Sequence, residues 1–212
     1  NVSPDPRNTS VASIDVLLSE SINLATLTAA DFTLTRDGGA NLLTGSESVT
    51  LVSGTTYRLS GLASLTAGDG DYVLTLTMTG VQDPAGNVGT GSAADSWWVD
   101  TTAPTGVFFT NVSPDPRNTS VGTVVVLLSE TSINTTTFTA ADFTLTRNAG
   151  PNLLTGSETL VPLGGGFYLF SDLSGLTGSD GVYTLTLSMT NVQDLAGDSG
   201  TGSASDSWTM DT

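Results

Sequence analysis

The chain has 212 residues, of which 21 are acidic and five basic, so its formal net charge is −16. This charge argues against nucleic acid and anionic membranes as partners, because both require a basic face, whereas it permits cations. Histidine, cysteine and lysine are absent from the sequence, which excludes disulfides, thiolate or imidazole metal sites and a lysine-containing phosphate loop. We find no apolar run long enough to span a bilayer, and we expect no direct membrane insertion.

An internal repeat divides the chain into two copies. The segment NVSPDPRNTS stands at positions 1–10 and again at positions 111–120. After one inserted residue, Thr131, the copies stay in register to the end of the sequence. Such agreement indicates tandem domains, which we place at residues 1–102 and 103–212.

Short runs that alternate apolar residues with Thr or Ser predict β-strands along the first copy. Ile14, Val16 and Leu18 share one face of the first such run, and Phe32 and Leu34 share one face of the next. Between them, the stretch NLATLTAADF could form at most one helical turn. The clearest alternation is that of Tyr72, Leu74, Leu76 and Met78, which the second copy repeats at Tyr183, Leu185, Leu187 and Met189.

The last predicted strand of each copy carries tryptophan. Trp97 aligns with Trp208, and the alternation places both in the core, whereas Trp98 aligns with Thr209 and points outward. We therefore predict that Trp98 makes a partner contact: either it packs at the hinge between the two domains, which is favoured because tryptophan is more often buried, or it is an adhesive surface residue. About seven short antiparallel strands in about 105 residues are typical of an Ig-like β-sandwich. The predicted fold is all-β, with two tandem Ig-like antiparallel β-sandwich domains.

Three segments carry a family likeness: LSESINLATLTAADFTLT, DGDYVLTLTMTGVQDPAGN and VDTTAPT. They resemble the bacterial Ig-like domains that stand in tandem along large surface adhesins and biofilm proteins. The most specific parts are the Asp-x-x-Gly-Asn turn at 83–87 and the Asp-Thr-Thr-Ala-Pro linker at 100–104; in the second copy the turn ends in Asp198 instead of asparagine. The resemblance implies non-enzymatic, extracellular or cell-surface spacers whose partners are neighbouring repeats, and several relatives bind calcium at domain junctions.

The resemblance also implies where each domain begins. In this family the first strand follows the proline of the linker, so residues 106–112 would open domain two. Domain one, which begins at Asn1, then lacks an equivalent first strand. We expect that strand either to have been cut off within a repeat or to come from elsewhere.

The order of the strands sorts the acidic residues between the two poles of each sandwich, because the loops of an antiparallel sandwich alternate between its ends. The predicted metal-binding residues at the junction are Asp100, Glu130, Asp194 and Asp198, faced by Asp69 and Asp71 of domain one. Their counterparts in domain one are Glu20, Asp83 and Asn87. Calcium takes about six to eight oxygen ligands, which such loops offer, so calcium is the predicted ion. The alternative to a metal site is a structural role: Asp83 and Asp194 would only form turns, and Asp69 would belong to a tyrosine corner.

Serine is abundant, but the sequence has no histidine or lysine to activate it, so we predict no enzymatic activity. The leading hypothesis is a structural stalk or spacer unit of a long surface or secreted adhesin, rigidified by calcium at the domain junction. A second hypothesis is a self-assembling filament or surface-layer subunit, in which identical chains complete one another's sheets. A third is a carbohydrate- or ligand-binding module that uses Trp98 or Tyr57.

Overall fold

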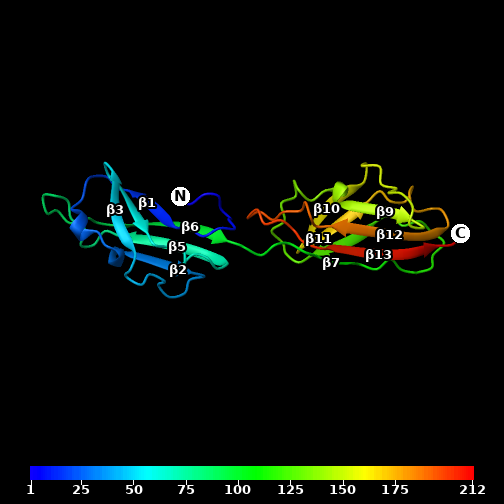
Figure 1. The fold of residues 1–212 in the computed structure, drawn as a ribbon, viewed down its shortest axis with the longest axis horizontal. Coiled ribbons are helices and arrows are strands. Elements are labelled where there is room, and N and C mark those ends of the chain that lie inside the picture. The colour runs from blue at the N-terminus through cyan, green and yellow to red at the C-terminus, as the bar shows by residue number, and fades with distance from the viewer. The chain divides into compact units, whose positions relative to one another are not determined.

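Two β-sandwich units make up the chain in its computed structural model, which describes residues 1–212 apart from the side chains of Val107 and Phe108. We call them unit 1 (Asn1–Thr102) and unit 2 (Ala103–Thr212). Each unit contains two antiparallel sheets (Figure 1). One hydrophobic core lies in each unit. The predicted all-β class with tandem Ig-like sandwiches is confirmed. Within the described residues, no helix is long and apolar enough to cross a membrane.

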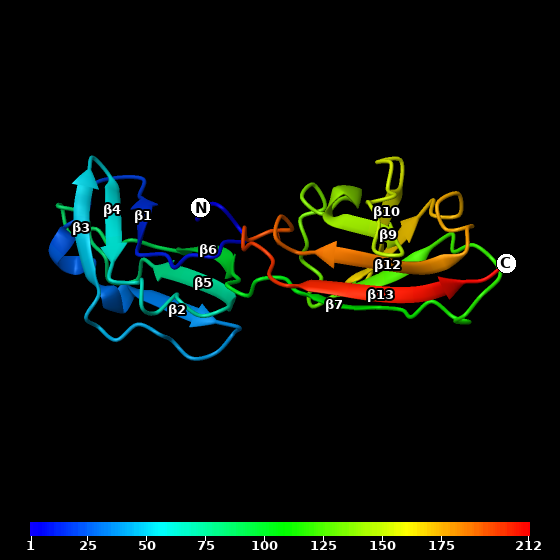
Figure 2. The same cartoon turned by 45° about the vertical axis from the view of Figure 1, so that its right-hand side comes forward.

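Unit 1 has two three-stranded sheets, with strand orders β1-β4-β3 and β2-β5-β6. Figure 2 shows β4 between β1 and β3 in the first of these sheets. The strands are β1 (Ser13–Leu17), β2 (Phe32–Arg36), β3 (Ser48–Ser53), β4 (Thr56–Ser60), β5 (Gly70–Thr77) and β6 (Ser92–Val99).

The stretch for which we predicted at most one helical turn contains two 3-10 turns, η1 (Leu24–Thr26) and η2 (Ala29–Asp31). The side chains of Asn23 and Thr28 each accept a hydrogen bond from the backbone N–H two residues further on. Two turns form because each has its own capping residue.

Unit 2 repeats this plan and adds one strand. Its sheets have the orders β10-β11-β8-β7 and β13-β12-β9. The elements are β7 (Gly106–Phe109), β8 (Val124–Leu128), η3 (Ala140–Asp142), β9 (Phe143–Arg147), β10 (Thr159–Gly164), β11 (Phe167–Ser171), β12 (Gly181–Ser188) and β13 (Ser203–Met210). Strand β7 pairs with β8. The counterpart of β8 in unit 1 is β1, which ends its sheet in the described part of that unit.

The two cores are centred on equivalent aromatic pairs. Trp97 stacks on Tyr72 with ring centroids 5.6 Å apart, and Trp208 stacks on Tyr183 at 5.7 Å. All four side chains are buried, which confirms the predicted inward position of both tryptophans. Trp98 is 47% exposed, as expected for the opposite face of β6.

A buried glutamate organises the same turn in each unit. The Glu158 carboxylate accepts hydrogen bonds from the backbone N–H groups of Thr155 and Gly156, both at 2.9 Å. Burial alone raises the pKa of Glu158, but these bonds outweigh burial and leave the pKa below its ordinary value. Glu47 has the equivalent bonds, and its pKa is lowered in the same way. These two carboxylates are satisfied by their own turns.

Candidate metal centre

The turn between the last two strands has the same backbone design in both units. In unit 1, Oδ1 of Asp83 accepts hydrogen bonds from the N–H groups of Ala85 and Asn87, both at 2.8 Å. In unit 2, Oδ1 of Asp194 accepts from the N–H groups of Gly197 at 2.7 Å and Asp198 at 2.9 Å. One carboxylate oxygen of each aspartate therefore holds its turn together, as the structural alternative predicts.

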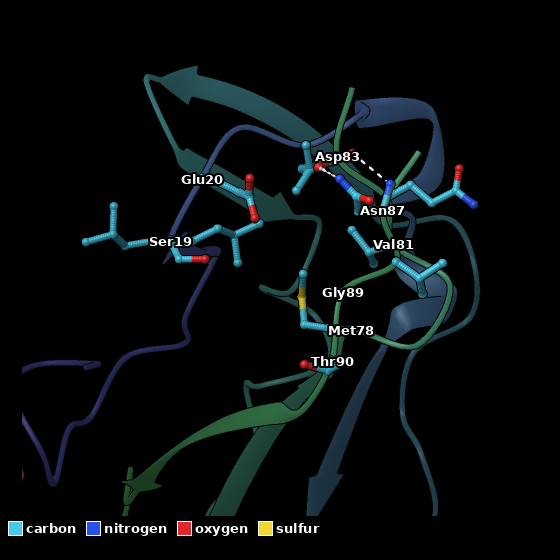
Figure 3. Close-up of a pocket in the computed structure, with 13 residues that line it drawn as sticks. Ser19, Glu20, Met78, Val81, Asp83, Asn87, Gly89 and Thr90 are labelled. Carbon is cyan, nitrogen blue, oxygen red and sulfur yellow. Dashed lines mark hydrogen bonds between the residues drawn. The ribbon is translucent and has the colours of Figure 1, made fainter. Parts of the chain in front are cut away.

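The second carboxylate oxygen distinguishes the two units. In unit 1, the Asn87 side-chain amide donates to Oδ2 of Asp83 at 2.6 Å (Figure 3), and this bond is the largest cause of the lowered pKa of Asp83. In unit 2, Asp198 takes the place of the asparagine, so the side-chain amide that donates in unit 1 is missing. Oδ2 of Asp194 accepts no hydrogen bond from the described residues, although Asp194 is only 1% exposed. A buried carboxylate oxygen in this state is costly unless a cation compensates it.

Glu130 brings a second carboxylate to the same place. One of its carboxylate oxygens lies within 4.8 Å of a carboxylate oxygen of Asp194. The Ser132 hydroxyl donates to Oε2 of Glu130 at 2.9 Å, and the Ser132 carbonyl accepts from the N–H of Leu195 at 2.7 Å. Like charges at this separation repel each other, and a cation between them would reverse the sign of that interaction.

Ser132 was not among the residues predicted for this site. The signal that could have found it is the inserted Thr131, which stands between Glu130 and Ser132 and has no counterpart in the first copy.

The equivalent place in unit 1 is different. Glu20, Asp83 and Asn87 line a hollow of about 320 Å³ (Figure 3). Glu20 has the strand parity of the inward-facing Ile14 and Val16, which predicts an inward position, but Glu20 is exposed, so the parity is wrong for this residue. The physical reason is that β1 ends at Leu17, and within the described residues no further strand covers this side of unit 1. The Glu20 carboxylate stays in water, and burial does not demand a cation beside it. The role of Glu20 as a metal ligand stays a prediction.

The predicted ligands Asp69 and Asp71 lie at the opposite pole of unit 1. Oδ1 of Asp69 accepts from the hydroxyl of Thr101 at 2.7 Å and from its N–H at 2.8 Å, while Oδ2 accepts from the Thr102 hydroxyl at 2.9 Å. These bonds, the Thr101 hydroxyl first, lower the pKa of Asp69. Asp71 is exposed and pairs with Trp98 across the strands. Asp69 thus anchors the end of unit 1, and a metal-binding role of either aspartate stays a prediction.

The remaining predicted residues are distributed through unit 1. Asp100 is half-buried, and its Oδ1 accepts from the N–H of Thr102 at 3.1 Å; its part in a metal site stays a prediction. The use of Tyr57 for ligand binding is wrong, because Tyr57 is 2% exposed and its hydroxyl accepts from the N–H of Ile22 at 3.0 Å. Trp98 is accessible on the surface, and its role as a partner contact stays a prediction.

Comparisons with known proteins return structures only: no family model matches the sequence, and no curated protein matches it. The I-band fragment I67-I69 from titin is 13% identical over 97% of this chain and 62% of the fragment, with a TM-score of 0.40. The N-terminal part of the bacterial S-layer protein SbsC is 16% identical over 96% of this chain and 42% of that chain, with a TM-score of 0.31. The S-layer protein rSbsC(31-844) is 17% identical over 99% of this chain and 25% of that protein's chain, with a TM-score of 0.33. This chain spans less than two thirds of the length of each, and the likeness concerns the fold alone.

Proposed function

We propose that this chain is a non-enzymatic, structural pair of Ig-like repeats from a long extracellular surface protein, and that calcium stabilises unit 2. The single observation that carries the metal is the buried Oδ2 of Asp194, which accepts no hydrogen bond from the described residues and lies beside Glu130. Tandem sandwiches with a high negative charge suit a spacer that is exposed to a calcium-containing medium.

The chemistry of the donors selects the ion. The side chains of Glu130, Asp194, Asp198 and Ser132 offer only oxygen, and the turns around them add backbone carbonyls. Calcium accepts about six to eight such ligands in irregular arrangements, whereas magnesium demands a near-octahedral site. Zinc and copper prefer nitrogen or sulfur ligands, and this sequence contains neither histidine nor cysteine.

We extend the proposal to Asp100 on the basis of covalent connectivity. Asp100 precedes Ala103, the first residue of unit 2, by three positions. The same linker continues to Thr105, whose carbonyl accepts from the N–H of Ser129, the neighbour of Glu130, at 3.0 Å. Asp100 as a further ligand would tie the linker to unit 2 through the ion. The function is then mechanical, because the ion removes freedom of movement between neighbouring repeats.

Calorimetric titration and thermal unfolding in calcium and in EDTA test this proposal. Ligand that binds only the folded state stabilises it by RT ln(1 + [L]/Kd), about 2.7 kcal/mol at a hundredfold excess over Kd. We expect Glu130→Gln to abolish the stabilisation of unit 2, while the matched control Glu20→Gln leaves it intact. Asp100→Asn should weaken binding if the linker contributes a ligand. Identical unfolding curves in calcium and in EDTA would refute the calcium site.

A second candidate function is a self-assembling filament or surface-layer subunit. One observation favours it: among the described residues of unit 1, β1 ends its sheet without a further strand. Edge strands of this kind can pair with another chain. Sedimentation velocity over a range of concentrations separates the two functions, because a subunit of this type should associate and a spacer should stay monomeric.

A further inference from the structure

Unit 2 shows how the first strand closes one of these sandwiches. Strand β7 runs antiparallel to β8, with Gly106 opposite Leu128 and Phe109 opposite Val126, and it also contacts β13 of the other sheet. Phe109 is buried in the core of the unit. One short strand therefore covers an edge of the first sheet and bridges to the second.

The residues before β7 extend this bridge. The carbonyl of Pro104 accepts from the N–H of Thr201 at 3.0 Å, next to β13. On the other side, the N–H of Thr105 donates to Oγ of Ser129 at 2.8 Å, and the carbonyl of Thr105 accepts from the N–H of Ser129 at 3.0 Å. Residues 104–109 thus form one continuous bridge between the two sheets.

The first sheet of unit 1 is uncovered where this bridge would lie. In unit 2, the β8 residues Val124 and Val126 are buried. Their counterparts on β1, Ile14 and Val16, are only half-buried, and the neighbouring Leu17 is 76% exposed. The two strands have similar inward patterns, so the difference in burial comes from the cover that β7 provides.

The second sheet shows the same difference. A Cβ on Gly106 would lie 3.4 Å from Cγ of Met189 and 3.5 Å from Cβ of Ala204, so β7 packs directly on these side chains. Met189 is 0% exposed beneath it. In unit 1, the corresponding Met78 is half-buried and the corresponding Ala93 is exposed.

Two hollows in unit 1 lie where residues 104–109 lie in unit 2. Ser19, Met78 and Thr90 line the hollow of about 320 Å³ shown in Figure 3, and Ser19 and Thr90 are the counterparts of the two residues that bind the 104–105 backbone in unit 2. Ile14 and Ala93 line the other, of about 170 Å³. Leu17 lines both hollows, so they adjoin along β1. We call the combined feature the β1 groove.

The chain enters unit 1 at the mouth of this groove. Asn1 lines the smaller hollow, and the N–H of Val2 donates to Oδ2 of Asp95 at 2.8 Å. In unit 2, the N–H of Val112 makes the equivalent bond to Asp206 at 2.9 Å, three residues after β7 ends. The backbone at Val2 is therefore placed as it is where β7 leads into unit 2.

We infer that the β1 groove is an acceptor site for a β-strand that has the pattern of residues 104–109 and is joined directly to Asn1. To fit the groove, such a strand needs a small residue over Met78 and Ala93 and a large apolar residue at the position equivalent to Phe109. A covalently joined strand would need no additional residues to adopt the register of β7. A strand from a second copy would first have to remove its own buried Phe109 from unit 2. The inference rests on the proposed repeat function for the source of the strand and is independent of calcium.

The test extends the full 212-residue chain at its N-terminus with a copy of residues 102–110. Differential scanning calorimetry should show a rise of about 10 °C or more in the unfolding transition of unit 1, with that of unit 2 unchanged as an internal standard. Hydrogen exchange of the β1 amides should slow by about tenfold or more. The matched control carries, within the copied segment, the change equivalent to Phe109→Asp, and it should lose both effects.

Other outcomes would overturn the inference. If the extension changes neither the unfolding transition of unit 1 nor the exchange of β1, the groove does not accept this strand. If the unextended chain forms dimers in sedimentation experiments and the extension dissociates them, the occupant is a second copy of the chain. Loss of calcium binding alone would overturn the metal centre and leave this result unaffected.

Discussion

Asp198→Asn rebuilds in unit 2 the turn that unit 1 already has. In unit 1, the Asn87 amide donates to Oδ2 of Asp83 at 2.6 Å. An asparagine at position 198 would offer the same donor to Oδ2 of Asp194, which is buried and accepts no hydrogen bond from the residues that the structure describes. The substitution also removes one negative charge from the site.

The expected effect depends on calcium. A hydrogen bond to a charged group contributes about 1.5–3 kcal/mol, and the near-complete burial of Asp194 favours the upper part of that range. In EDTA, we therefore expect Asp198→Asn to raise the free energy of unfolding of unit 2 by about 2–3 kcal/mol. In calcium, the gain should shrink or change sign, because the variant exchanges a charged carboxylate for a neutral amide with a single oxygen, which holds the ion less strongly.

Calorimetry of the full chain in both buffers measures these effects, and Asn87→Asp in unit 1 is the reciprocal variant. It removes the amide donor from an exposed pair, so it should lower the unfolding temperature of unit 1 in EDTA, by less than Asp198→Asn raises that of unit 2. If Asp198→Asn destabilises unit 2 in EDTA, or if calcium stabilises the variant as much as the original chain, our interpretation of the turn is wrong.

Three further predictions concern the two cores and the response to pH. Trp97→Ala and Trp208→Ala should each cost about 3–5 kcal/mol in urea unfolding, and the exposed Trp98→Ala about 0.5 kcal/mol or less; equal costs would contradict the assigned strand faces. Thr177→Val should cost about 1–3 kcal/mol, since the buried Thr177 hydroxyl accepts from a core N–H at 2.9 Å, and Thr177→Ser should restore stability. The lowered pKa of Glu158 stabilises unit 2 above the ordinary glutamate pKa of about 4.3, and this contribution disappears as the pH falls through the lower folded value. Glu158→Gln should therefore weaken the acid dependence of unit 2 stability in pH-resolved melting, and an unchanged acid dependence would argue against this role.

The amino-acid sequence alone determined the repeat, the sandwich class and the inward tryptophans. In a strand, successive side chains point to opposite faces, so the alternation around Trp97 and Trp208 carries the burial pattern without knowledge of the partner strands. The exchange of Asn87 for Asp198 between the two turns was also visible in the sequence.

Only the tertiary structure decided the burial and the hydrogen-bond partners of the candidate functional residues. Glu20 and Glu130 occupy equivalent positions, yet one is exposed and the other half-buried, because burial depends on segments distant in sequence. Tyr57 looked available to a ligand but is buried, with its hydroxyl bound to the backbone of Ile22, 35 positions earlier. The effect of Asp198 became clear only from the fold, which buries Oδ2 of Asp194 away from water. A missing hydrogen-bond donor is costly because the acceptor is buried, and no local sequence pattern specifies that burial.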